Sequence, residues 1–508
     1  MRLLTTLGIV LIANLLAALP AAAEFRAGFG SRVVTPQNFE SWTDADGDAQ
    51  YSPDIDTFND TNGNGVFDAA WMAGFQNGRA ANNVHDDLMA VAAVFDDGET
   101  RIGIVTADVV GLMANFVASV RTAVPPELEL DYVLVHATHN HEGPDTQGLW
   151  GAADFESGVS EAYMALLKAE MVGALEDSVA ALEPARLSMA TIDGYDAALG
   201  TMDTRKPLIL DPGIRVLMLK RPSSDEGNDS VIGTLVNYGM HVELAWDKNL
   251  SFTADLAGYL RRGLSAGLEY DGEIVRPGIG GTTLWLTGNI GGLATVLPGE
   301  AVTDPWTQEE ITESGHAKAR AFGYGVATAV LDTVLTPDGF YEDPAPTLQV
   351  AARSVDVPLA NYPLAAASLL GLLDRDFDVG LLPPQLTTET EVALLKIGQA
   401  RVAAIPGELY PEIAVGGIEN PSGADYEMAP IEVPPFRPAM QGRVNLMVNL
   451  ANDAIGYIIP KSEWDNEAPW IYDYEEETYG EVVSVGPDGA PSVHGALLPL
   501  LQADGDTP

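Results

Sequence analysis

An apolar stretch that ends in histidines constrains this chain more than any other feature. Residues 133–135 form an apolar, largely β-branched run, His136, His139 and His141 follow, and a Gly-Pro pair at 143–144 marks a turn. In an extended backbone, side chains two residues apart point to the same face. We therefore expect His139 and His141 to project together where a strand gives way to a loop. Such a pair can place one imidazole on a metal and use the other to move protons.

Apolar runs with strand character alternate with helical patterns along the rest of the chain. The expected strands lie at 24–36, 101–107, 131–137, 186–192, 214–219, 231–238, 347–357 and 393–405, and the expected helices at 113–124, 160–182, 254–267 and 308–335. This alternation, with polar groups collecting after strands, is typical of α/β proteins. We predict a mixed α/β fold in which a layered β-sheet core is flanked by helices. Residues 24–508 contain no repeat and no clear linker, so we expect a single large domain.

The N-terminus has the pattern of a secretory signal peptide. Arg2 precedes an apolar run at 3–19, and the alanines at 21–23 form a small-residue cleavage site. A retained membrane anchor is the alternative, but Asn14 interrupts the apolar run. We expect residues 1–23 to be cleaved, the protein to be secreted or periplasmic, and no stable membrane anchor to remain.

Charge and cysteine content exclude several partners and ligands. The chain has 26 basic and 73 acidic residues, which gives a formal net charge of −47. The phosphates of nucleic acids and of anionic membranes repel such a polyanion, so we expect no nucleic-acid partner. There is no cysteine, which excludes disulfides and thiolate ligands. Metal ligands must therefore come from His, Asp, Glu, Tyr or water.

An insert rich in aspartate and asparagine occupies residues 43–70. Its oxygen-bearing side chains recur at every second position around glycines, a spacing typical of calcium-binding loops. The candidate ligands are Asp44, Asp46, Asp48, Asp60, Asn62, Asn64 and Asp68. Trp71 stands where an EF-hand has its bidentate glutamate, so a complete EF-hand is not expected. We predict calcium binding within this insert; the alternative is a surface loop that binds nothing.

Further polar side chains follow apolar runs in the same way as the histidine pair. His241 comes after an apolar strand, Glu408 follows a Pro-Gly turn, and Tyr457 stands beside a glycine. Two histidines and one carboxylate with an open fourth position make a hydrolytic zinc site. His136 would share the face of the histidine pair but lie deeper in its strand, where it is most simply a buried support.

Several short motifs along the chain occur in an order that carries a family resemblance. They are Val84-His85-Asp86, Thr138-His139-Asn140-His141-Glu142-Gly143-Pro144, Asn237 to His241, Asp255-x-x-Gly258-Tyr259, Pro406-Gly407-Glu408 and Asn452-Asp453-x-x-Gly456-Tyr457. Together they resemble the neutral/alkaline, non-lysosomal ceramidase family. The resemblance extends from about residue 26 to residue 486, most of the mature chain.

This resemblance implies a catalytic domain with a zinc ion held by His139, His241, Glu408 and Tyr457. It also implies that His141 handles protons beside the reacting amide and that Arg205 contacts the substrate. Members of the family cleave the amide of N-acyl sphingoid bases to a fatty acid and a free base. The chain would then be a secreted, zinc-dependent amidohydrolase that acts on a lipid N-acyl amide through metal-activated water.

Two departures separate this chain from the family pattern. The family has an N-x-G-D-x-S-P segment, whereas residues 288–295 have Gly292 in place of the acid and Ala294 in place of the serine. An alanine can neither attack an amide nor donate a hydrogen bond, and losing one such donor commonly costs ~10²–10³ in rate. Residues 461–508 are also too few for the immunoglobulin-like C-terminal domain of roughly 100 residues that members often carry.

Three functions therefore stay open on the sequence. The first is a zinc amidohydrolase that acts on ceramide, and the second is a hydrolase of another N-acyl amide, such as a small or soluble one. The third is a non-catalytic, calcium-stabilised secreted binding protein on the same scaffold. The complete ligand set favours the first two, and the changes at Gly292 and Ala294 motivate the third.

Overall fold

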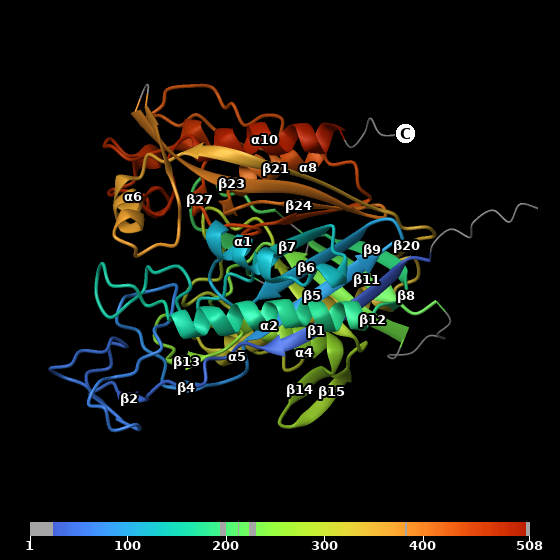
Figure 1. The fold of residues 1–508 in the computed structure, drawn as a ribbon, viewed down its shortest axis with the longest axis horizontal. Coiled ribbons are helices and arrows are strands. Elements are labelled where there is room, and N and C mark those ends of the chain that lie inside the picture. The colour runs from blue at the N-terminus through green and yellow to red at the C-terminus, as the bar shows by residue number, and fades with distance from the viewer. Residues whose placement is uncertain (1–23, 194–199, 212, 223–229, 382–383, 504–508) are drawn as a thin grey trace, which may run out of the picture.

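Three β-sheets meet at one hydrophobic core in the computed structural model, and helices pack on their other faces (Figure 1). The structure describes residues 24–193, 200–211, 213–222, 230–381 and 384–503. The expected signal peptide at 1–23 lies outside these residues. The predicted fold class, a mixed α/β fold with a layered sheet core and flanking helices, is confirmed.

The first sheet contains the strand that leads to the histidine pair. Its strands, in spatial order, are β7 (Tyr132–Ala137), β6 (Arg101–Ala107), β5 (Met89–Asp96), β1 (Arg26–Val33) and β8 (Glu183–Pro184). β5 and β6 form an antiparallel hairpin, and β6 runs parallel to β7. The sequence predicts an edge strand at 24–36, whereas β1 lies between two strands, although β8 pairs with only its first two residues.

Two helices cover the outer face of the first sheet, as the sequence predicts. They are α1 (Ala114–Ala123) and α2 (Glu161–Ala180). Close packing of α2 on β1 depends on two glycines, because a Cβ at Gly28 would lie 2.1 Å from the carbonyl oxygen of Ser178. A Cβ at Gly30 would lie 2.4 Å from the carbonyl oxygen of Ala174. Alternation along β1 thus directs glycines toward α2 and Ala27 and Phe29 into the core.

The second sheet carries the strand that precedes His241. Its strands, in spatial order, are β16 (Thr282–Thr287), β12 (Val231–Tyr238), β11 (Ile214–Lys220), β9 (Arg186–Ile192) and β20 (Tyr341–Asp343). It is covered by α4 (Asp255–Ser265) and α5 (His316–Val334). The predicted helix at 308–335 is too long at its start. Residues 310–311 instead pair with residues 302–303, and Gly315 adopts a left-handed φ of 140° before the first helical turn.

The third sheet positions the carboxylate and the tyrosine. It contains β21 (Leu348–Pro358), β23 (Pro384–Ile397), β24 (Ala400–Ala404) and β26 (Val444–Val448), with β22 (Asp378–Leu381) paired to β23. Helices α8 (Phe436–Ala439) and α10 (Gly489–Ala503) pack on it. The single strand predicted at 393–405 is wrong, because the chain turns at Gly398, where φ is 57°, and β23 and β24 pair as a hairpin.

Short elements connect the three sheets. The strand pairs are β2 (Trp42–Thr43) with β3 (Thr57–Phe58), β4 (Asn83–Val84) with β13 (Ser251–Phe252), β10 (Met202–Asp203) with β17 (Ala294–Thr295), β14 (Gly267–Tyr270) with β15 (Glu273–Pro277), β18 (Val302–Thr303) with β19 (Glu310–Ile311), and β25 (Glu408–Leu409) with β27 (Tyr457–Ile458). Among the described residues, the remaining helices are α6 (Tyr362–Leu369), α7 (Pro411–Val415) and α9 (Tyr479–Val482), with 3-10 turns at Pro126–Leu128, Lys461–Glu463 and Ile471–Asp473. Within the described part of the chain, no helix is both long and apolar enough to span a bilayer.

Candidate metal centre

The candidate site forms where loops leave one strand of each large sheet. His139 and His141 follow β7, His241 follows β12, and Glu408 follows β24. Tyr457 lies opposite Glu408 in the parallel pair of β25 and β27. These five residues carry the chemistry expected from the sequence. The junction of the three sheets brings His139, His141, Glu408 and Tyr457 to one cavity and places His241 beside His139 and His141.

Buried hydrogen bonds join the end of β7 to the end of β16 at this junction. The Thr287 hydroxyl, at the end of β16, donates to the carbonyl oxygen of Thr138 at 2.8 Å. His136 Nε2 accepts from the Thr287 N–H at 3.2 Å, and its Nδ1 lies 2.7 Å from the Thr106 hydroxyl. Burial lowers the pKa of His136 to about 3, so its ring is neutral. The expectation that His136 is a buried support is confirmed.

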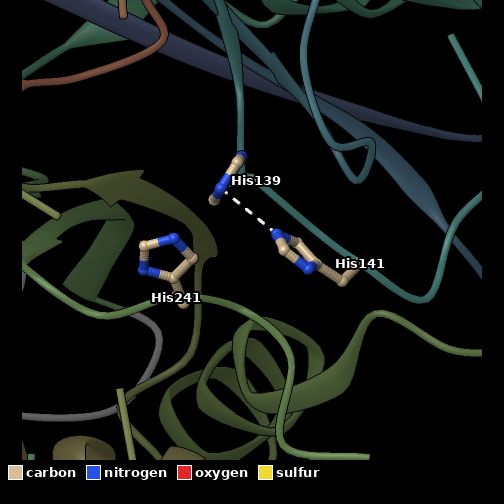
Figure 2. Close-up of side chains that lie close together, drawn as sticks. All are labelled: His139, His141 and His241. Atoms are coloured by element: carbon tan, nitrogen blue, oxygen red, sulfur yellow. Dashed lines mark hydrogen bonds between the residues drawn. The ribbon is translucent and has the colours of Figure 1, made fainter. Parts of the chain in front are cut away.

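Backbone carbonyls orient the two imidazoles that come from different sheets. His139 Nδ1 lies 2.7 Å from the carbonyl oxygen of Val110, and His241 Nδ1 lies 3.2 Å from that of Ala294. A carbonyl only accepts, so each Nδ1 carries a proton and each Nε2 is the nitrogen that faces the site. Figure 2 shows His139, His141 and His241 gathered around one point. This arrangement, with one nitrogen anchored and the other directed inward, is typical of metal-binding histidines.

Glu408 faces both of these nitrogens. Its Oε2 lies 3.5 Å from His139 Nε2 and 3.3 Å from His241 Nε2. Glu408 Oε2 and His241 Nε2 are both buried without a hydrogen-bond partner. Ligands about 2.0–2.1 Å from a tetrahedral zinc ion are separated by similar distances, roughly 3.3 Å. Two acceptors that face each other across this gap fit a cation between them, and the residues present therefore suit a metal.

The electrostatics of Glu408 agree with this geometry. Burial would raise the pKa of its carboxyl, but His139 and His241 outweigh burial and lower the pKa below its ordinary range. Glu408 is therefore ionised at neutral pH and can act as a ligand. Burial raises the pKa of the neighbouring Tyr457 phenol, and the Glu408 charge raises it further.

His141 differs from the other two imidazoles in what lies behind it. Its Nε2 is 3.2 Å from His139 Nε2, and its Nδ1 is 3.2 Å from Glu243 Oε2. Burial and the neighbouring imidazoles lower the pKa of His141 well below its ordinary value, so the ring is neutral. One nitrogen from each of His139, His141 and His241 lies within 4.8 Å of the other two. The three histidines together can therefore hold a metal ion.

The segment that carries the histidine pair is tightly fixed. His139 adopts a left-handed backbone with φ of 63°, which is unusual for a residue with a side chain. The buried Arg79 guanidinium donates to the carbonyl oxygen of His141 and pairs with Glu142 at 3.3 Å. Asn140 Nδ2 donates to the carbonyl oxygen of Thr253 at 2.8 Å. His139 and His141 therefore meet through a kinked loop, and not through the extended strand that the spacing predicts.

One cavity of about 560 Å³ opens onto the candidate ligands. His139, His141, Glu408 and Tyr457 line it together with mainly apolar side chains. The apolar lining includes Phe75, Leu149, Trp150, Trp246, Leu359, Leu364, Leu373 and Val483. A second cavity of about 380 Å³ shares Leu293, Tyr457 and Tyr479 with the first. The site thus combines a polar cluster with walls that suit an apolar chain.

Arg205 lines the second cavity, and its guanidinium is already engaged. It forms a two-pronged ion pair with Glu481, with both N···O distances at 2.9 Å. It also donates to the Tyr410 hydroxyl at 2.8 Å and to the carbonyl oxygen of Glu463 at 3.0 Å. The structure thus places Arg205 as a buried link between two segments beside Tyr457. The contact of Arg205 with a substrate, expected from the sequence, stays a prediction.

The segment at 288–295 reaches the site through its backbone. The Ala294 carbonyl oxygen accepts both the N–H and the Nδ1–H of His241. A Cβ added at Gly292 would lie 2.7 Å from Asp203 Oδ1, so a larger residue there requires Asp203 to move. Burial raises the pKa of Asp203 to about 7. The absence of side-chain donors at Gly292 and Ala294 therefore leaves the orientation of His241 intact.

Comparisons with known proteins extend the description of the fold. No protein-family model matches the sequence, and no curated protein matches it. Similar solved structures include two ceramidases. The neutral ceramidase from Pseudomonas aeruginosa has a TM-score of 0.64 and 16% identity, covering 95% of this chain and 75% of that chain. A structure described as a ceramidase complexed with C2 has a TM-score of 0.63 and 14% identity, covering 95% of this chain and 76% of that chain.

The chain has a ceramidase-like fold. At these identities the similarity establishes the architecture, and the chemistry must be argued from the site itself.

Glu243 is a site residue that the sequence reasoning missed. It is buried, lines the first cavity and lies behind the His141 ring. A signal was present, because Glu243 follows His241 at a spacing of two, like His141 after His139.

The Asp-rich insert at 43–70 is a second, separate candidate cation site. Ligand oxygens of Asp44, Asp46 and Asp48 lie within 4.8 Å of one another. The carboxylate of Asp44 accepts the N–H groups of residues 47 and 49. Asp60 in the same way accepts those of residues 63 to 65. No helix precedes α1 in the described chain, which agrees with the expected lack of a complete EF-hand, and calcium binding stays a prediction.

Proposed function

We propose that the mature chain is a secreted, zinc-dependent amidohydrolase that cleaves the amide bond of N-acyl sphingoid bases. One observation carries the proposal: two inward-facing imidazole nitrogens and an ionised, unpartnered carboxylate oxygen meet at 3.3–3.5 Å beside an apolar cavity. The ceramidase-like fold supports it. We also propose that residues 1–23 direct export of the protein.

The ligands that would hold the zinc are His139, His241, Glu408 and Tyr457. The carbonyls of Val110 and Ala294 fix both imidazoles, so little ordering is needed when the ion enters. When bound, zinc would polarise the amide carbonyl and make water a better nucleophile at neutral pH. Ala294 excludes a covalent intermediate at its position, so water is the nucleophile in this proposal.

His141 is the residue that would move the proton. Its Nε2 faces the candidate ligands and its ring is neutral, so this nitrogen can accept a proton and later deliver it to the leaving amine. Glu243 Oε2, 3.2 Å from His141 Nδ1, would stabilise the charged ring that forms in between. Together, His141 and Glu243 would act as an oriented base. A buried imidazole without a neighbouring carboxylate would not.

The first cavity would take the acyl chain. Its lining is rich in leucine, phenylalanine and tryptophan side chains. It offers no charged partner for a polar chain apart from the site itself, Asp247 and an already paired Arg375. A second candidate is hydrolysis of another N-acyl amide. The observation that favours it is the absence of a side-chain donor at Ala294, which removes one possible contact to the substrate.

The test is a hydrolysis assay with a fluorescent ceramide and a panel of other N-acyl amides, run beside elemental analysis of the purified mature chain. We expect near-stoichiometric zinc, cleavage of ceramide, and loss of both in His139→Ala. His316→Ala is the matched control, because His316 is half-buried at the start of α5 and stacks on His85 away from the cavity. It should keep both properties.

The outcomes separate the candidates. Zinc with cleavage of other amides alone would assign the second candidate. A wild-type chain that binds no zinc and cleaves no amide would contradict the proposal and favour a non-catalytic binding protein.

A further inference from the structure

The segment from Tyr362 to Leu373 is apolar on every side. It contains helix α6 and reads Tyr-Pro-Leu-Ala-Ala-Ala-Ser-Leu-Leu-Gly-Leu-Leu, without a charged residue until Asp374. Tyr362, Leu369 and Leu370 are 73%, 74% and 73% exposed. A surface helix of a water-soluble protein normally turns a polar face to solvent. Here the solvent-facing side is as apolar as the inner side.

The inner side of this segment borders the candidate active site. Leu364, Ser368 and Leu373 line the same cavity as His139 and Glu408. Only Ala365 of α6 is buried, so the helix is a thin wall between this cavity and solvent. Figure 1 shows α6 standing at one side of the molecule, beside the third sheet.

Specific contacts hold α6 in this exposed position. Asn361 caps the helix, because its side chain accepts the N–H of Leu364 at 3.2 Å. The same side chain donates to the carbonyl oxygens of Val482 and Ser484 at 2.8 and 2.9 Å. The apolar side chains are therefore presented by a fixed helix, and their exposure is part of the folded structure.

A second exposed aromatic side chain comes from a loop that also lines the cavity. Phe155 is 84% exposed, and the loop that carries it contributes Leu149 and Trp150 to the cavity lining. This loop contacts the segment after α6, because a Cβ at Gly148 would lie 1.9 Å from the carbonyl oxygen of Leu372. We call Phe155, Tyr362, Leu369 and Leu370 the rim patch.

Charges around the rim patch restrict what can cover it. Asp154 and Glu156 flank Phe155, and Asp374 and Asp376 follow the apolar segment. Arg375 between them is bound to Asp453 by an ion pair at 2.5 Å. With a net charge of −47, a second copy of the chain or an anionic bilayer would be repelled. A zwitterionic lipid surface combines an apolar interior with cationic outer groups, and it fits both the patch and its acidic border.

We propose that the rim patch docks the protein reversibly on zwitterionic lipid surfaces, with the cavity mouth facing the bilayer. Side chains of this kind insert at the boundary between headgroups and acyl chains. The lipid-binding step stands without the proposed function. Its use, the direct transfer of a lipid N-acyl amide from the bilayer into the cavity, rests on that function.

The test is co-sedimentation of the mature chain with phosphatidylcholine vesicles. We expect wild type to bind, and Leu369→Asp/Leu370→Asp to lose at least ~10-fold in partition, because two charges would enter the apolar interface. Leu335→Asp is the matched control: Leu335 is 78% exposed at the end of α5 and does not line the cavity, so binding should be unchanged. Thermal unfolding shows whether each variant is folded.

Three results would overturn the docking proposal. They are no binding of wild type, equal binding of the double variant, or an oligomer in solution that the double variant abolishes, which would assign the patch to a second copy. Adding phosphatidylglycerol to the vesicles should weaken wild-type binding at low salt; stronger binding would contradict the charge argument.

A hydrolysis assay separates this proposal from the proposed function. The double variant should lose hydrolysis of vesicle-embedded ceramide and keep that of a short-chain, soluble N-acyl amide. If wild type binds vesicles and cleaves nothing, the docking stands and the proposed function fails. If both substrates are cleaved equally well by the double variant, the transfer step is wrong.

Discussion

Two regions of this molecule gather cation ligands, and they differ in how those ligands are held. His139, His141 and His241 are buried, and one nitrogen from each lies within 4.8 Å of the other two. The carboxylates of Asp44, Asp46 and Asp48 satisfy the same distance but are partly exposed. In the histidine centre, Glu408 Oε2 and His241 Nε2 have no hydrogen-bond partner. In the loop, carboxylates accept backbone N–H groups and face water.

The difference teaches that burial, and not the number of ligand atoms, distinguishes a cluster that a cation would stabilise. A buried polar group without a partner costs about 1–3 kcal/mol, and a charged one costs more. An ion bound at the histidine centre would therefore add stability. The loop is already solvated and internally bonded, so an ion there has less to add.

The largest effect should come from removing the unpartnered carboxylate. We expect Glu408→Ala to lose stoichiometric zinc and at least ~10³ of its hydrolytic rate, because both the charge and the ligand disappear. Elemental analysis and the ceramide assay measure this. Asp46→Ala removes a carboxylate from the exposed loop and should change neither property. If Asp46→Ala lost as much zinc and hydrolytic rate as Glu408→Ala, the two regions would not differ in their contribution to metal binding.

A smaller effect is expected when metal is removed. A ligand that binds only the folded state at 100 times its Kd stabilises it by about 2.7 kcal/mol, so chelation should lower the unfolding midpoint by several degrees. Zinc should restore the midpoint in wild type and not in Glu408→Ala. The triple variant Asp44→Asn/Asp46→Asn/Asp48→Asn should respond to zinc as wild type does. If it does not respond, the loop carries the stabilising ion.

The smallest effect concerns Asp203, a buried carboxyl that belongs neither to the histidine centre nor to the exposed loop. Burial raises the pKa of Asp203 to about 7, whereas the unfolded value is near 3.8. Between these values only the unfolded state ionises, so unfolding releases a proton and stability falls as pH rises from about 4 to 7. Below and above this window Asp203 adds no slope. Asp203→Asn should remove on the order of 1 kcal/mol of pH dependence, measured by urea unfolding at pH 5 and pH 8.

Asp44→Asn is the control for that pH dependence, because its side chain is partly exposed and distant in sequence from the buried cluster. Its pH profile should follow that of wild type. A steeper change in Asp44→Asn than in Asp203→Asn would show that exposed carboxylates dominate the pH response.

Much of the fold could be predicted from periodicity alone. The helices near 113–124, 160–182 and 254–267 and most strands agree with the structure, because apolar spacing records which face of each element is buried. The predicted element boundaries were wrong where two elements share one apolar run. The turn at Gly398 divides such a run, and the hairpin of residues 302–303 with 310–311 takes residues whose composition favours a helix.

The site was predictable where residues follow strands, and not where tertiary contacts decide. His139, His141, His241, Glu408 and Tyr457 lie together because three sheets end at one place, which motif order can indicate. Spacing cannot show that the carbonyl oxygen of a distant residue orients a ring. It also cannot show the left-handed backbone at His139, which places its imidazole by a kink.

The two carbonyls that orient His139 and His241 have a consequence for how the site can change. Each belongs to the main chain, at Val110 and Ala294, so the imidazoles keep their direction whatever side chain those positions carry. The residue at 294 is thus uncoupled from metal binding. If the proposed function holds, exchange of this residue could change which amide is recognised without redirecting the imidazole of His241.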